Sequence, residues 1–418
     1  MAKITRRTAL AAFGSAIATP MLRLPAFAQS GPIRIGYAGA LTGPAAFTGV
    51  DIRRGGELAI ADINSRGGIK GRMLELVARD DEHNPVRTVA QYRELVEREG
   101  VVAMLGATNS ASMLAVAPIV NDTLKVPVIM PATDATAITE NEAAKAGRDN
   151  FLFRVGMYGT GQGNFMVDTA VKKLGFTKIG LLNWTGGWGV TGRGELNRRL
   201  RELGLTPVAD ETFDSSDTDM TPQLIKLKNA GAQCILNYAL VRENTFVVQT
   251  KQKLGDTTPY ISGWGIAGPA FWVAAGKAAE GVLTSSTITI DGPQSPERLA
   301  LLQKYQTTFK APMEAPYSVF GAYDAIFLFA EVMSRDGTDP AAIRKGLENV
   351  PTFKGLVKQY DRPVFTKDRH NALTEDDMIM CRWTEGKLLE ITYDAGKPTV
   401  ATDDRTRRTL DPTDLHLL

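Results

Sequence analysis

The sequence predicts an α/β protein with two lobes, each built as a parallel sheet covered by helices. Predicted strands and helices alternate along most of the chain, which is the order that parallel sheets require. This alternation restarts with the helix predicted for residues 165–174. The chain has 418 residues, a length that favours two domains over one.

The first series of elements opens on an apolar strand, and a glycine-rich loop at residues 39–49 follows it. Apolar residues then recur at helical spacing until Gly67-Gly68, which ends the helix. The predicted strands of this series lie at residues 33–37, 74–80, 101–105 and 127–130, and the predicted helices lie at residues 53–65, 85–99 and from Ser110 onward, with a kink at Pro118.

The second series repeats this order and is followed by a longer helical region. Its predicted strands are residues 178–183, 206–213, 233–238, 259–262 and 281–285, and its predicted helices are residues 165–174, 192–203, 221–229 and 243–254. Helices are then predicted at residues 295–310 and 317–335. After Gly355 the chain is strand-rich, with strands at residues 378–383 and 388–393, and from Lys397 onward it reads as a polar tail.

Composition and charge exclude several classes of protein and site. The formal net charge is +2, so nothing favours binding to nucleic acid or to a membrane surface. Cys234 and Cys381 lie far apart in apolar segments, which favours two buried free thiols over a disulfide. Three histidines are too few for a histidine-based metal site or general-base constellation, and we expect no metal or cofactor.

The N-terminus has the pattern of an export signal. Thr5-Arg6-Arg7 is basic, residues 9–22 are apolar, and Ala26-Phe27-Ala28 places small residues where a signal peptidase cleaves. The paired arginines favour the twin-arginine route, although Ala9 stands where that motif usually has a bulky apolar residue. A transmembrane anchor is the alternative, but the apolar stretch is shorter than the roughly 20 residues of a span. We therefore predict a signal peptide at residues 1–28 and a mature protein in the periplasm.

Two loops of the first lobe are candidates for ligand binding, because ligands of open α/β sheets bind beyond the carboxyl ends of the strands. Asn109 and Ser110 stand at a helix N-terminus after the third strand, where free N–H groups favour a carboxylate. Simple capping of that helix is the alternative. After the fourth strand come Ala132, Thr133 and Asp134, and Asp134 is either a helix cap or the partner of a cationic group.

In the second lobe, the loops after strands carry large apolar side chains. Trp184 and Trp188 follow one predicted strand, Leu240 follows another, and Trp264 follows a third. Tryptophans gathered at one sheet edge indicate a wall for a flat or apolar ligand. The alternative is that each tryptophan only anchors its own loop.

Motifs of common enzymes are absent from the sequence. There is no Gly-x-Gly-x-x-Gly after the first strand, no Walker lysine and no Gly-x-Ser-x-Gly, so we expect no enzyme activity. Asp80-Asp81-Glu82-His83 suggests a metal site, but its place between a strand end and Pro85 favours a solvated turn with a helix cap.

Nearly all of the mature sequence resembles the leucine/isoleucine/valine-binding proteins, the periplasmic solute-binding subunits of branched-chain amino acid ABC transporters. The stretches that carry the resemblance are Gly39-Ala40-Leu41-Thr42-Gly43-Pro44, Ala61-Asp62-Ile63-Asn64-Ser65-Arg66-Gly67-Gly68-Ile69-Lys70-Gly71, Asp80-Asp81 with Pro85, and Ala279-Glu280-Gly281. The resemblance implies the type I periplasmic binding protein fold, in which two Rossmann-like lobes close around a solute. It places three crossovers between the lobes, near Arg154, Ser285 and Gln359.

The resemblance also implies roles for the loops identified above. The family's carboxylate-binding serine falls on Ser110, its contacts in the next loop fall on Ala132, Thr133 and Asp134, and its aromatic wall falls on Trp188.

This chain departs from the family at several of its positions. Trp264 stands where the family has an acidic residue that contacts the ligand's ammonium, Leu240 replaces a tyrosine and Asp134 replaces a threonine. The family's frequent disulfide is missing, with His83 and Asn109 at its positions. Either Asp134 supplies the lost negative charge, or the ligand is an aromatic or apolar carboxylate without an ammonium.

These features predict an extracytoplasmic solute-binding protein of an ABC importer, whose partners are a small solute and the permease subunits in the inner membrane. Lobe 1 is predicted to comprise residues 31–153 and 286–358, lobe 2 to comprise residues 154–285 and 359–396, and the polar tail to comprise residues 397–418. A ligand-sensing ectodomain for a membrane receptor and an extracytoplasmic enzyme on the same scaffold are the alternatives.

Overall fold

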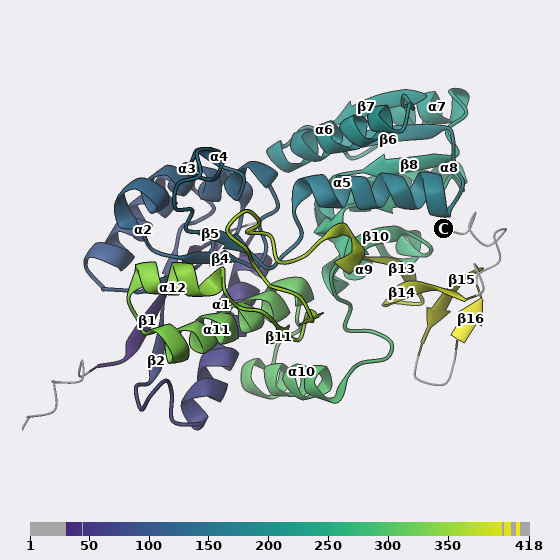
Figure 1. The fold of residues 1–418 in the computed structure, drawn as a ribbon. Helices are drawn as coiled ribbons and strands as arrows, with labels where there is room; N and C mark the ends of the chain where they lie inside the picture. Colours follow the sequence, from purple (N-terminus) through teal and green to yellow (C-terminus); the bar gives the residue numbers. More distant parts are fainter. Residues whose placement is uncertain (1–30, 44, 395–396, 403–406, 410–418) are drawn as a thin grey trace, which may run out of the picture.

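The computed structural model describes residues 31–43, 45–394, 397–402 and 407–409. The predicted signal peptide, residues 1–28, lies outside these residues. Figure 1 shows two α/β lobes side by side, each with its own sheet, and chain segments that pass between them. No helix among the described residues has the length and apolar character needed to cross a membrane.

The sheet of lobe 1 has five parallel strands in the order β2-β1-β3-β4-β5. Their bounds are β1 Ile33–Gly39, β2 Leu74–Asp80, β3 Ala103–Leu105, β4 Val128–Met130 and β5 Leu152–Arg154. Leu105, Ile129 and Phe153 belong to one core cluster, whereas their neighbours Met104 and Val128 belong to another. Both faces of the sheet are therefore buried, as in other parallel sheets.

Helices from two separate parts of the chain cover this sheet. Helices α1 and α11 lie against each other so closely that Gly55 faces the backbone of Val319. The helical elements of lobe 1 are α1 Ala46–Ser65, α2 Pro85–Glu97, α3 Ser110–Ile119, η1 Val120–Leu124, η2 Thr136–Ile138, α4 Glu142–Lys145, α10 Pro296–Phe309, α11 Pro316–Asp336 and α12 Pro340–Leu347. A short hairpin, β11 Phe353–Lys354 with β12 Gln359–Tyr360, follows α12.

The sheet of lobe 2 combines five parallel strands with an antiparallel extension, in the order β16-β15-β14-β13-β10-β9-β8-β6-β7. Its strands are β6 Ile179–Trp184, β7 Ala209–Phe213, β8 Cys234–Asn237, β9 Tyr260–Ser262, β10 Leu283–Ser286, β13 Ile379–Thr384, β14 Lys387–Asp394, β15 Lys397–Ala401 and β16 Arg407–Thr409. Its helical elements are α5 Gly159–Asp168, η3 Thr169–Lys173, α6 Gly187–Glu202, α7 Thr221–Asn229, α8 Val241–Leu254, η4 Trp264–Ile266, α9 Pro269–Ala275 and η5 Gly276–Ala279.

Several elements differ from the sequence-based expectation. Helices α1, α5 and α6 begin five to seven residues earlier than predicted, at Ala46, Gly159 and Gly187. Strand β5 and helices α9 and α12 are not predicted at all. Lys397–Ala401 and Arg407–Thr409 form strands β15 and β16, so these stretches are not the plain polar tail that the sequence suggests. The main-chain donors and acceptors at the edge of strand β14 can pair with an added strand of any side-chain pattern. The sequence pattern therefore does not reveal these strands.

The chain passes between the two sheets three times, after β5, after β10 and before β13. The first and third of these segments are joined by main-chain hydrogen bonds, because Arg154 N–H donates to the His370 carbonyl and Ala372 N–H donates to the Arg154 carbonyl, both at 2.8 Å. His370 stacks on Phe153, with ring centroids 4.0 Å apart. The first and third segments between the lobes therefore form one bonded unit.

Buried thiols are confirmed, since Cys234 and Cys381 are both free and buried. Burial raises the pKa of the Cys234 thiol to about 12.

Among the described residues no group of three or more His, Cys, Asp or Glu side chains is arranged to hold a metal ion. At the Asp80–His83 turn, Asp81 accepts the N–H of His83, and Asn84 caps helix α2.

The close approach of α1 and α11 generates a prediction about Gly55. A Cβ at this position lies 2.3 Å from the Val319 carbonyl oxygen, so Gly55→Ala must push the two helices apart. We expect a loss of about 1–3 kcal/mol in the free energy of unfolding, measured by urea titration. Gly194 in helix α6 is the matched control, because a Cβ there has no atom within 4 Å. Gly194→Ala is expected to be neutral or to stabilise by up to about 1 kcal/mol. Equal midpoints for both variants contradict this account of the helix contact.

Candidate ligand-binding site

The strand order of each sheet reverses at one point, and side chains from loops at or next to these two points meet between the lobes. In lobe 1 the reversal lies between β1 and β3, and in lobe 2 it lies between β6 and β8. Such switch points are where open α/β sheets bind ligands. Ser110 and Asp134 come from the strand ends of lobe 1, and Trp188 and Tyr238 come from those of lobe 2. We call these four residues the inter-lobe site.

Asp134 lies at the centre of the inter-lobe site, with only 5% of the residue exposed. Its Oδ1 accepts a hydrogen bond of 3.2 Å from the hydroxyl of Ser110, the first residue of helix α3. The same hydroxyl oxygen accepts the N–H of Ala135, also at 3.2 Å. Ser110 therefore joins the start of α3 to the loop that follows β4.

Trp188 forms the lobe 2 side of the site. Its indole Nε1–H donates to Oδ2 of Asp134, so a hydrogen bond runs directly from one lobe to the other. The indole ring meets the ring of Tyr238 edge-on, with centroids 5.2 Å apart. It also covers Gly265, where a Cβ would lie 2.8 Å from the indole. Glycine at that position leaves room for the indole ring.

Arg154 connects this site to the segments between the lobes. The residue is fully buried, and its terminal nitrogens donate to the Ala135 carbonyl at 2.6 Å and to Asn371 Oδ1 at 3.1 Å. Burial lowers the pKa of Arg154 to about 10, against the opposing effect of the Asp134 charge. The guanidinium therefore remains protonated at neutral pH.

Burial also raises the pKa of the Asp134 carboxyl above its usual range. The Trp188 N–H, the Arg154 charge and the Ser110 hydroxyl all stabilise the carboxylate, but they do not fully offset the loss of hydration. Any group that adds positive charge next to Asp134 will favour its ionised form.

A second contact between the lobes lies close to the first. Trp264 of lobe 2 packs against Tyr317 at the start of α11, with ring centroids 4.5 Å apart, and both residues are buried. Burial raises the pKa of Tyr317 to about 12, and the charges of Asp51 and Asp134 act in the same direction. The hydroxyl of Tyr317 therefore stays protonated within electrostatic reach of Asp134.

Several buried polar atoms around the inter-lobe site have no hydrogen-bond partner among the described residues. They are Thr133 Oγ1, Gln162 Oε1, the Tyr238 hydroxyl and Ser318 Oγ. Gln162 and Tyr238 both lie against Gly263. Burial raises the pKa of Tyr238, and the nearby charge of Asp134 raises it further. An unpartnered buried polar atom costs about 1–3 kcal/mol, so a polar solute that bonds to these atoms gains affinity.

The structure brings some of the predicted residues together and leaves others apart. Ser110 and Trp188 each donate a hydrogen bond to Asp134, and Thr133 is buried beside Asp134 in the chain. Ala132 is buried in the core cluster that runs under the loop.

The other predicted residues have local roles in the structure. Asn109 caps helix α3 through the N–H of Ser112, at 2.8 Å. Trp184 donates its indole N–H to Ser215 at 2.8 Å, within lobe 2. Leu240 precedes helix α8 and is partly exposed.

Four residues around the site are not among the sequence-based candidates: Arg154, Gln162, Tyr238 and Tyr317. Tyr238 directly follows strand β8, so its place at a strand end is a signal that the sequence contains. Arg154 and Gln162 carry no such signal. Arg154 lies in strand β5, which the sequence pattern does not reveal, and Gln162 lies in the helix that follows it. Tyr317 comes from a helix that is distant from the site in sequence.

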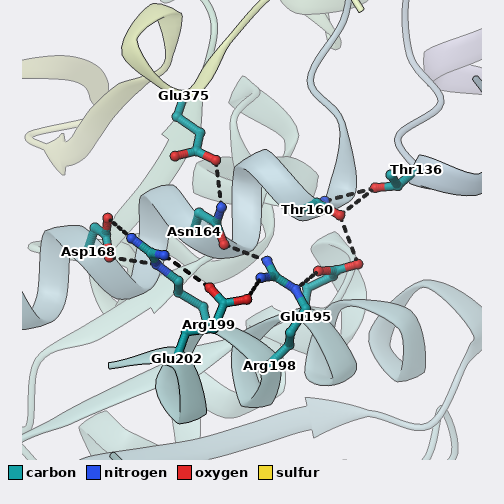
Figure 2. A network of polar contacts seen from close by, with 9 residues as sticks. All are labelled: Thr136, Thr160, Asn164, Asp168, Glu195, Arg198, Arg199, Glu202 and Glu375. Carbon is teal, nitrogen blue, oxygen red and sulfur yellow. Dashed lines mark hydrogen bonds and ion pairs between the residues drawn. The ribbon is translucent and has the colours of Figure 1, made fainter. Parts of the chain in front are cut away.

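A polar network beside the site joins the lobes near the connecting segments (Figure 2). Thr136 of lobe 1 and Thr160 of α5 share a hydrogen bond of 2.8 Å between their hydroxyls, and Thr160 donates to Glu195 of α6 at 3.1 Å. Asn164 donates to Glu375, on the third connecting segment, at 2.6 Å. The remaining members of the network are Asp168, Arg198, Arg199 and Glu202.

Comparison with known proteins identifies the family. A profile described as periplasmic binding protein matches residues 32–387. A Brucella melitensis protein named Leu/Ile/Val-binding protein homolog 3 is 24% identical over 362 residues, which cover 85% of this chain and 93% of that protein. A Pseudomonas aeruginosa protein named leucine-, isoleucine-, valine-, threonine-, and alanine-binding protein is 27% identical over 360 residues, which cover 82% of this chain and 92% of that protein.

Solved structures share the fold at low sequence identity. A type 1 periplasmic binding protein from Bordetella pertussis has a TM-score of 0.73 at 24% identity, covering 86% of this chain and 99% of its own. The branched-chain amino acid transporter substrate binding protein of Streptococcus pneumoniae, solved in complex with isoleucine, has a TM-score of 0.73 at 22% identity, covering 90% of this chain and 99% of its own. The fold is thus the two-lobed type I fold, and the chain belongs to the periplasmic binding protein family that includes the leucine/isoleucine/valine-binding proteins.

Proposed function

We propose that this protein is the periplasmic solute-binding subunit of an ABC importer and that it binds an amino acid, or an apolar or aromatic carboxylate, between its lobes. The observation that carries the proposal is the direct hydrogen bond between Trp188 of lobe 2 and Asp134 of lobe 1, next to the switch points of the two sheets. A bond at this place means that closure of the lobes encloses whatever lies against these side chains.

Closure then couples binding to transport. The bonded segments around Arg154 act as the hinge, and the lobes turn about them between an open and a closed form. A solute that contacts both lobes stabilises the closed form in proportion to its preference for that form. The permease subunits recognise the closed form and so receive loaded protein.

The aromatic side chains bind the apolar body of the solute. Trp188 and Trp264 both lie between the lobes, where packing on an aromatic or branched group contributes on the order of 1 kcal/mol per aromatic pair beyond burial. Thr133 and Ala132 are buried in the loop after β4, and we expect them to contribute hydroxyl and backbone contacts to the solute.

A thermal-shift screen tests the proposed function. The panel contains aliphatic amino acids, aromatic amino acids, benzoate- and cinnamate-type acids, and small amides. A solute that binds only the folded protein raises the melting temperature. At a concentration of 100 times its Kd, it stabilises the folded state by about 2.7 kcal/mol. We expect at least one amino acid or apolar carboxylate to raise it. Failure of every such compound contradicts the proposed function.

Replacing Trp188 tests whether the predicted site is the one that binds. Trp188→Ala removes both the aromatic wall and the bond to Asp134, so we expect affinity to fall about 10-fold or more, measured by calorimetry with the solute found above. Trp184→Ala is the matched control, because that indole bonds to Ser215 inside lobe 2. Unchanged affinity in Trp188→Ala, or an equal loss in both variants, rules out this site.

A further inference from the structure

Helix α5, the first helix of lobe 2, takes its N-terminal cap from lobe 1. The first N–H groups of a helix have no partner inside it, and the side chain at the N-cap position usually accepts one of them. Tyr158 occupies that position, and its side chain makes no capping hydrogen bond within the described residues. Instead, Gly159 N–H donates to the Asp134 carbonyl at 2.6 Å, and Thr160 N–H donates to the Thr136 hydroxyl oxygen at 3.0 Å. Both acceptors follow strand β4 of lobe 1.

Counting protons fixes the direction of the hydrogen bonds between Thr136 and Thr160. The Thr160 hydroxyl donates its single proton to Oε1 of Glu195 at 3.1 Å. The contact of 2.8 Å between the two hydroxyls must therefore use the proton of Thr136 (Figure 2). Each hydroxyl then both donates and accepts, in a chain that ends on a carboxylate, and bonds in such chains strengthen one another. We call Thr136 and Thr160 the threonine latch.

The lobe 2 side of the latch is fixed to lobe 2. Asp168 of α5 accepts two hydrogen bonds from the Arg199 guanidinium of α6, at 3.0 and 2.7 Å. A Cβ at Gly163 would lie 2.7 Å from the Cβ of Glu195, so the two helices are in close contact. Helix α6 in turn packs on strands β6 and β8. Helix α5 therefore moves together with lobe 2.

The chain just before α5 is fixed to lobe 1. The N–H groups of Val155 and Gly156 both donate to the Met130 carbonyl at the end of β4, at 3.0 and 3.4 Å. Met157 and Tyr158 lie between Gly156 and the first residue of α5. A rotation of lobe 2 at these two residues moves α5 relative to the loop after β4. Since an N–H···O bond needs a donor–acceptor distance of about 2.7–3.2 Å, a displacement of about 1 Å breaks the latch.

We propose that the threonine latch forms only when the lobes are closed, and that Thr136 and Thr160 are positioning residues that stabilise the closed form without contacting the solute. This inference rests on the proposed function, and it adds a contribution to closure that the protein itself supplies. The latch acts on every solute alike, because the apparent Kd rises by the same factor as the closed fraction of the protein falls.

A reversible covalent bond tests whether the latch separates when the lobes open. The two hydroxyl oxygens are 2.8 Å apart, so Thr136→Cys combined with Thr160→Cys brings two sulfur atoms within reach of an S–S bond of about 2.05 Å. Cys234 and Cys381 are buried, so copper–phenanthroline oxidises the new pair, and dithiothreitol reduces it again. We expect oxidation to slow release of the solute found in the thermal-shift screen at least 10-fold, and reduction to restore the rate. Equal release rates in the two states, or failure of the new pair to bridge, overturns the proposal.

Valine variants test the latch without a covalent bond, with circular dichroism to confirm folding. Thr136→Val keeps the shape of the side chain and removes its hydroxyl, so we expect affinity to fall about 10-fold by calorimetry. Thr160→Val is expected to act in the same direction, and the double variant to lose less than the product of the two single factors. Thr245→Val is the matched control, because that buried hydroxyl donates to the Val241 carbonyl within helix α8 at 2.8 Å. Equal affinities in Thr136→Val and Thr245→Val contradict the latch.

Small-angle X-ray scattering of the solute-free protein separates this inference from the proposed function. The oxidised cysteine pair gives the closed reference, and we expect Thr136→Val to have a larger radius of gyration than this reference. If it does and no compound of the screening panel binds, the latch stands and the proposed function fails. If the two radii are equal while a solute binds, the latch is wrong and the proposed function stands.

Discussion

The buried carboxylate of Asp134 is the constraint around which the site between the lobes is arranged. It lies where the two lobes meet, and it accepts one hydrogen bond from Ser110 and one from Trp188. Burial raises the pKa of this carboxyl group, and both hydrogen bonds oppose that effect because they stabilise the ionised form. The carboxylate therefore links the position of helix α3 in lobe 1 to that of helix α6 in lobe 2.

The loop that carries Asp134 is also bonded to the segments between the lobes. Arg154 donates to the carbonyl of Ala135, next to Asp134, and to Asn371 on the third connecting segment. A rotation of the lobes that shifts these segments also moves the loop that carries Asp134. The polar network from Thr136 through Thr160 to Glu195 is a second link between the loop that follows β4 and lobe 2 (Figure 2). Since partly exposed ion pairs contribute little to stability, we interpret this network as orienting α5 and α6 rather than strengthening the fold.

Much of the fold is predictable from the sequence, because alternating apolar strands and amphipathic helices imply parallel sheets. The starts of α5 and α6 are not, because they are rich in glycine, a poor helix former. The structure explains why glycine is present. A Cβ at Gly192 would lie 2.2 Å from the ring of Tyr238, and one at Gly163 would lie 2.7 Å from Glu195. Packing against these side chains outweighs the low helix propensity of glycine. The apolar periodicity of one helix does not show which residues of other elements it will contact.

The same limit applies to the candidate site. Strand ends can be located from the sequence, and three of the residues chosen there, Ser110, Asp134 and Trp188, meet in the structure. Their bonding pattern is not visible in the sequence, because a serine hydroxyl can serve a ligand or a neighbouring side chain equally well. Once Asp134 uses that hydroxyl, the negative charge belongs to lobe 1 and the aromatic wall to lobe 2. Under the function proposed here, affinity depends on closure, since only the closed form brings both groups to one solute.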